Sequence, residues 1–204
     1  MDLIITICML IVNLQIVLKP DFYLPIQVKN RTDWSLVKLT SIGQYRLVRK
    51  SRPEVPQHLH TGIDFARPSD NYKFEPIFPV YNGTVISIRD DGPFAQIIIQ
   101  HKMNNLQFWT VYEHVSGIKV SIGDEVNPAN PIARFMNRNE LDRFGYQFDH
   151  FHFEVLKNKP LKIHPAKKLP QRQYSAPTLT CYSETDLMKN YYNPELFLLT
   201  GKEK

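Results

Sequence analysis

The chain has 204 residues, of which 43% are apolar and 12% aromatic, and this composition supports one hydrophobic core and excludes a disordered protein. Its formal net charge of +5 favours contact with polyanions. The Lys and Arg residues are scattered outside residues 157–168 and are not interleaved with aromatic residues, so we expect no nucleic-acid partner.

Residues 3–18 form an apolar run that Lys19 and Pro20 close. The run has the length of a signal-peptide core and is shorter than the roughly 20 apolar residues of a membrane span. No Lys or Arg precedes it, and no small-residue cleavage site follows it. We therefore expect residues 1–20 to be a signal peptide or an N-terminal membrane anchor, with a buried helix or strand as the alternative. Either of the first two predicts an exported protein of the periplasm, the cell envelope or the extracellular space.

The two cysteines lie far apart, Cys8 in the apolar run and Cys181 near the C-terminus. This number and spacing do not indicate a disulfide framework. Cys8 as a lipid-anchor site is a minor alternative, because Thr6 and Ile7 before it are not small residues.

Residues 21–43 mix Pro, charged and aromatic residues without a period, and we interpret them as a lead-in segment. The segments that follow are rich in β-branched and aromatic residues and predict strands at residues 84–89, 95–101, 107–115, 131–135 and 150–156. Short turn sequences separate these segments, and short spacers favour antiparallel pairs because a parallel crossover needs a dozen or more residues. We expect an all-β or β-rich fold with an antiparallel sheet.

The patterned region, residues 44–165, is expected to form a single domain. Residues 166–204 contain prolines and no alternating pattern, and we interpret them as a C-terminal tail that wraps this domain. At most a short helix is expected there, near residues 184–192.

The first histidine motif is residues 60–64, His-Thr-Gly-Ile-Asp. In a regular strand His60 and Asp64 would face the same side, about 13 Å apart along the chain, which is too far for one metal ion. A bend or bulge at Gly62 would bring the imidazole and the carboxylate together, since glycine tolerates strained backbone angles.

The second motif is residues 149–155, where alternation places His150, His152 and Glu154 on one face and apolar side chains on the core face. The third motif ends a predicted strand, and by the same alternation Tyr112 and His114 share a face.

Zinc suits such a set of residues, because its catalytic sites use three His or carboxylate ligands and leave a position for water. Bound water becomes a nucleophile near neutral pH, and further histidines can move protons. A single His-x-His in a strand is more often structural, so the hypothesis depends on the three motifs together. His58 could replace His60 as a ligand but lies outside the motif, and we assign it to the rim. His101 and His164 are interpreted as ordinary strand-end or loop residues.

At these motifs the chain resembles the lysostaphin/LytM-type zinc metallopeptidases, enzymes that cut peptide bonds in peptidoglycan. The resemblance also includes residues 79–85 and 120–126, and it covers roughly residues 44–160. It implies an antiparallel sheet with a narrow groove that has the metal at its floor.

As the resemblance implies, one Zn²⁺ would be bound by His60, Asp64 and His152. His114 and His150 would be the catalytic pair, and Tyr112 would line the substrate groove. Residues 139–149 are bulky and acidic where the family usually has small residues with glycine, which leaves the choice of substrate open.

The predicted function is a zinc-dependent endopeptidase that hydrolyses peptide bonds of bacterial peptidoglycan. One alternative is a catalytically inactive member that binds and regulates another cell-wall hydrolase, although such proteins typically lose ligands and all five positions are filled here. A lipoyl- or biotinyl-carrier hairpin at residues 122–126 lacks a lysine at its tip, and a metallopeptidase acting on protein is a further alternative. The sequence does not define the bond that is cut or the oligomeric state.

Overall fold

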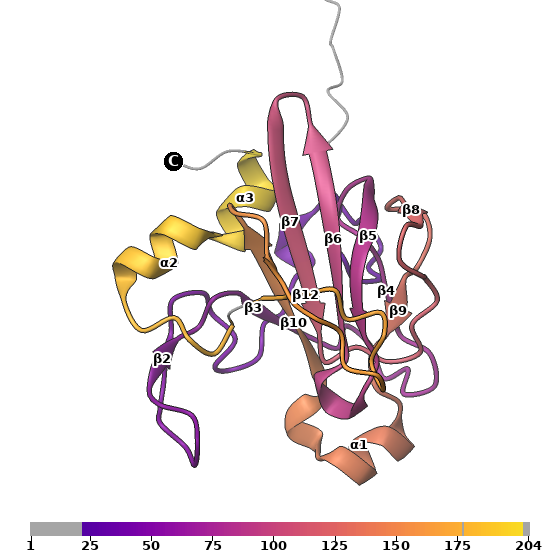
Figure 1. Cartoon of the computed structure of the whole chain (residues 1–204). Coiled ribbons are helices and arrows are strands. Elements are labelled where there is room, and N and C mark those ends of the chain that lie inside the picture. The colour runs from indigo at the N-terminus through magenta and orange to yellow at the C-terminus, as the bar shows by residue number, and fades with distance from the viewer. Residues whose placement is uncertain (1–21, 177, 202–204) are drawn as a thin grey trace, which may run out of the picture.

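The computed structural model describes residues 22–176 and 178–201, so the predicted signal peptide or anchor and Cys8 lie outside the described residues. Within this part, an antiparallel seven-stranded sheet has the order β13-β10-β7-β6-β5-β8, and β3 pairs with β10 (Figure 1). The strands are β3 (Ile63–Ala66), β5 (Gly83–Arg89), β6 (Gln96–Met103), β7 (Leu106–Glu113), β8 (Glu125–Val126), β10 (His150–Leu156) and β13 (Tyr191–Tyr192). The predicted β-rich class with an antiparallel sheet is confirmed.

Short antiparallel pairs and helices surround this sheet. The pairs are β1 (Val48–Arg49) with β2 (His58–Leu59), β4 (Pro76–Ile77) with β9 (Ala133–Arg134), and β11 (Leu161–Lys162) with β12 (Tyr174–Ser175). The helices are α1 (Arg138–Phe144), α2 (Glu184–Asn190) and α3 (Pro194–Thr200), with 3₁₀ turns η1 (Trp34–Leu36), η2 (Gly92–Phe94) and η3 (Tyr146–Phe148). Figure 1 shows α1 at one end of the sheet. No helix in the described ranges is long and apolar enough to cross a membrane.

The sequence prediction did not include α1 and α3, although both carry start signals. Asn137 accepts a hydrogen bond from the Glu140 backbone N–H, and the Glu140 side chain accepts one from the Asn137 N–H, which forms a capping box. The α3 helix begins with Asn193 as its cap and Pro194 in its first turn. These helices were missed because each is only seven residues long and presents few buried side chains, so hydrophobic periodicity gives a weak signal.

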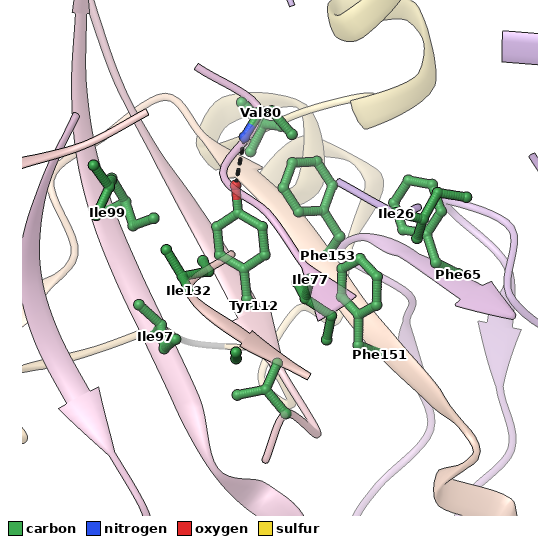
Figure 2. Close-up of a cluster of buried hydrophobic side chains, with 14 of the residues drawn as sticks. Ile26, Phe65, Ile77, Val80, Ile97, Ile99, Tyr112, Ile132, Phe151 and Phe153 are labelled. Carbon is green, nitrogen blue, oxygen red and sulfur yellow. Dashed lines mark hydrogen bonds between the residues drawn. The ribbon is translucent and has the colours of Figure 1, made fainter. Parts of the chain in front are cut away.

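The main core lies on the face of β10 that carries Phe151, Phe153 and Val155, all fully buried. Figure 2 shows Phe151 and Phe153 in this core. Both flanking segments contribute to this core. The ring of Phe197 in α3 packs 5.0 Å from that of Phe22 and 4.9 Å from that of Phe108. Burial of each such ring stabilises the fold by about 1.5–3 kcal/mol, so the lead-in and the tail are structural parts of the domain.

His101 lies in the same core with no exposed surface, and its ring stacks on Phe108 at 4.7 Å. Its Nδ1–H donates to the carbonyl oxygen of Asn82 at 2.9 Å, and its Nε2 accepts from the Thr110 hydroxyl at 2.7 Å. Burial lowers the pKa of His101 to about 4. The imidazole is therefore neutral in the folded protein at neutral pH.

Because the His101 pKa is about 4 in the folded chain and about 6.5 in the unfolded chain, the unfolded state binds the extra proton between these values. We expect His101 to remove about 3 kcal/mol of unfolding free energy as the pH falls from 6.5 to 4. Urea unfolding at several pH values measures this loss. His101→Gln should have a flatter pH profile than the wild type, and parallel profiles would contradict the assignment.

Candidate metal centre

His60 and Asp64 converge because the chain bends at Gly62, directly before β3. The His60 Nε2 atom lies 3.1 Å from Asp64 Oδ1, far closer than a regular strand would allow. A Cβ on Gly62 would lie 2.2 Å from the carbonyl oxygen of Phe153. The bend at Gly62 was predicted, but the expected reason was wrong in part. Gly62 is not among the residues with positive φ, and glycine is required there because β10 passes too close for a side chain.

The third member of the cluster comes from β10, whose register against β3 places His152 opposite Asp64. The His152 Nδ1 atom lies 3.0 Å from Asp64 Oδ1 and 2.9 Å from His60 Nε2. All three residues are buried, with 3–5% of their surface exposed. The structure thus brings together the three predicted ligand residues in one compact group of donor atoms.

This donor set fits zinc. The facing nitrogen and oxygen atoms of His60, Asp64 and His152 are 2.9–3.1 Å apart. Tetrahedral zinc with bonds of 2.0–2.1 Å needs ligand atoms about 3.3 Å apart, so a small outward shift would suffice. Among the described residues, this is the one group of three or more His, Cys, Asp or Glu side chains with the spacing of a metal site.

The two imidazoles, His60 and His152, each have a second partner that fixes their orientation. His60 Nδ1–H donates to the carbonyl oxygen of Gln44 at 2.8 Å, so its Nε2 lone pair points into the cluster. His152 Nε2 bonds to the carboxylate of Glu154 at 3.0 Å, and that buried carboxylate also accepts from the Thr61 hydroxyl at 2.5 Å. Such outer partners hold the tautomer and the ring orientation of metal-binding histidines.

Burial and charge act in opposite directions on these groups. Burial alone would raise the pKa of Asp64, but the adjacent imidazoles of His152 and His60 hold it far below its ordinary value. Burial alone would lower the pKa of His152, but Asp64 and Glu154 raise it to about 10. A metal cation that binds His152 Nδ1 must displace the proton that Asp64 and Glu154 stabilise on this imidazole. The affinity of the site for the cation therefore falls at low pH.

His114 and His150 lie beside this cluster. Their ring centroids are 5.1 Å apart, and His150 Nε2 is 3.9 Å from Asp64 Oδ1. His114 Nδ1–H donates to the carbonyl oxygen of Pro93 at 2.5 Å, which leaves Nε2 as the basic nitrogen. Burial lowers the pKa of both imidazoles, that of His150 to about 4, so both are neutral at pH 7.

The predicted place of Tyr112 in the groove is wrong. Its side chain is fully buried in the main core, and its hydroxyl oxygen accepts a hydrogen bond from the Val80 N–H at 3.0 Å (Figure 2). A strand that continues through His114 was expected, but β7 ends at Glu113. His114 has φ of +63°, so alternation ends there and the two side chains do not share a face.

The other histidines stay outside the cluster. His58 is buried and bonds through Nδ1 to the carbonyl oxygen of Pro56, so it is not a rim residue. His101 belongs to the core, and His164 is exposed. Sequence reasoning missed Arg49, whose guanidinium lies 2.6 Å from Asp64. No spacing rule connects Arg49 to the motif.

The acidic residues near α1 are paired within the protein. Asp149 forms an ion pair with Arg67 at 2.7 Å, and Glu140 forms one with Arg134 at 2.6 Å. Asp142 accepts a hydrogen bond from the Tyr146 hydroxyl at 3.0 Å. Many of the acidic side chains in this loop therefore form internal contacts that stabilise its fold.

A family model for peptidase family M23 matches residues 58–165. The search of curated proteins found no match. The chain is similar to a zinc-containing peptidase from Vibrio cholerae, with 26% identity over 69% of this chain and 36% of that chain, at a TM-score of 0.43. It thus spans little more than a third of that peptidase's length. LytU is 26% identical over 60% of this chain and 75% of its own, with a TM-score of 0.43.

The chain is also similar to a structure of the SpoIIQ–SpoIIIAH pore-forming complex, with 17% identity over 83% of this chain and 97% of that chain, at a TM-score of 0.44. The predicted resemblance to LytM-type peptidases is confirmed by the family model. Because the matched residues make up more than half of the chain, the protein belongs to peptidase family M23.

Proposed function

We propose that the protein is a zinc-dependent endopeptidase that hydrolyses peptide bonds of bacterial peptidoglycan. The observation that carries this proposal is the convergence of His60, Asp64 and His152 on one point, with two neutral imidazoles beside it. Zinc bound by the three ligands would supply a Lewis acid and make water nucleophilic near pH 7.

The orientation of the two adjacent histidines supports different roles. His114 keeps its proton on Nδ1 through the bond to Pro93, so its Nε2 is suited to accept a proton from the attacking water. His150 faces Asp64 and is suited to contact the oxyanion of the tetrahedral intermediate. Both rings are neutral at pH 7 because burial lowers their pKa values.

Peptidoglycan as the substrate is supported by the sequence motifs shared with the LytM-type enzymes. The net charge of +5 also suits a protein that works next to anionic wall polymers. We propose export through the apolar run at residues 3–18, as a signal peptide or a membrane anchor.

Removal of a ligand should abolish metal binding. We expect His152→Ala to lose zinc and hydrolysis together, because two of the three ligands cannot hold the ion in a site that keeps a water position. Metal analysis of the purified protein measures the zinc content. His164→Ala, which changes an exposed histidine, should keep one zinc per chain. Full zinc content in His152→Ala would refute the ligand assignment.

Removal of the proposed base should separate metal binding from turnover. His114→Asn is the suitable change, because asparagine tolerates the positive φ at this position better than most residues. We expect zinc content to stay at the wild-type level and kcat to fall by roughly 10²–10⁴-fold. Loss of the metal from this variant would show that His114 has a different role.

The substrate can be tested directly. The purified protein should release soluble muropeptides from intact peptidoglycan, and a chelator followed by added zinc should stop and then restore the release. Mass spectrometry of the products identifies the bond. Stoichiometric zinc without any released product, together with binding to another wall hydrolase, would instead support the regulatory alternative.

A further inference from the structure

The segment at residues 39–49 lies outside the residues matched by the family model. It nevertheless forms hydrogen bonds to two of the proposed ligand residues, His60 and Asp64. The backbone of Asp64 is fixed at both of its polar atoms, because its N–H donates to the Gly43 oxygen at 2.9 Å and its oxygen accepts from the Thr40 N–H at 3.0 Å. His60 is held in turn by the carbonyl oxygen of Gln44. Backbone groups of Thr40, Gly43 and Gln44 thus form an outer support for the proposed metal centre.

Arg49 is the charged side chain of this segment that reaches a proposed ligand residue. The short pair of β1 with β2 places Arg49 opposite His58, two residues before the ligand His60. The His60 N–H donates to the Leu47 oxygen at 2.9 Å, which continues the pairing toward the site. Within this frame Arg49 Nη2 lies 2.6 Å from Asp64 Oδ2, and only 15% of the Arg49 side chain is exposed.

The two oxygens of Asp64 therefore have separate partners. Oδ1 faces both His60 Nε2 and His152 Nδ1, at 3.1 and 3.0 Å. Oδ2 is bonded to the guanidinium of Arg49. A charge-assisted bond of this kind is among the stronger hydrogen bonds in proteins, so it opposes rotation of the carboxylate.

We propose that Arg49 is a positioning residue that keeps Asp64 a monodentate ligand by occupying its outer oxygen. The proposal rests on the proposed zinc function. A carboxylate with two unoccupied oxygens can bind a metal through both of them, and the second oxygen would take a coordination position that a catalytic zinc site keeps for water and substrate. An ion pair with a purely structural role would stabilise the loop without any effect on the coordination number.

Cobalt substitution distinguishes these two roles, because the visible absorption of Co²⁺ depends on its coordination geometry. We expect the wild-type protein loaded with Co²⁺ to show the intense bands of four-coordinate cobalt. Arg49→Gln should lose this intensity as Asp64 becomes bidentate, with kcat lowered by roughly 10–100-fold. Arg49→Lys should keep most of the intensity, because an ammonium group can still bond to Oδ2.

The matched control is Arg46→Gln. Arg46 lies in the same segment, but its ion pair is with Glu184 and both side chains are largely exposed. This variant should have the wild-type spectrum and kcat. A wild-type spectrum in folded Arg49→Gln would overturn the proposal. If the wild-type protein binds neither Zn²⁺ nor Co²⁺, the proposed function itself fails. If circular dichroism shows that Arg49→Gln is unfolded, the Co²⁺ spectrum of Arg49→Lys decides instead. Loss of the four-coordinate bands in Arg49→Lys would then count against the proposed role of the positive charge.

Discussion

The candidate metal centre depends on the register of β10 against β3. In this register His152 lies opposite Asp64, and Phe151 lies opposite Phe65. The rings of Phe65 and Phe151 stack at 5.0 Å in the main core. A slip of one residue would turn the two phenylalanines of β10 toward the site and its histidines into the core. The apolar face of β10 therefore fixes the position of the ligand on its polar face.

Burial of the site is possible because each of the three proposed ligand side chains has a dedicated partner. The imidazoles of His60 and His152 are oriented by the Gln44 oxygen and by Glu154. Asp64 is held by Arg49 on its outer oxygen. An unpaired charge in such a place would be strongly destabilising, whereas a paired and hydrogen-bonded set can be tolerated. The supporting contacts thus allow three charged or ionisable ligands to sit in one poorly solvated place.

The parts of the site that follow from alternation could be predicted from the sequence, and the parts that depend on a local break could not. His152 and Glu154 lie on the face that a regular strand predicts, because β10 runs through both without a break in register. Tyr112 was misplaced because β7 ends one residue before His114. Arg49 was missed because its contact arises from the pairing of β1 with β2, and two-residue strands leave almost no periodic signal.

The bulky loop before β10, residues 139–149, helps to hold the left-handed backbone at His114. A residue other than glycine or asparagine in this conformation costs free energy, of order 1–3 kcal/mol where strain is stored. The surroundings must hold it. The His114 ring packs 5.0 Å from Phe148 of the loop and 5.9 Å from Phe94, and its Nδ1–H is bound by Pro93. Small residues in this loop would leave the ring of His114 less confined, so the bulk supports the orientation that the proposed chemistry requires.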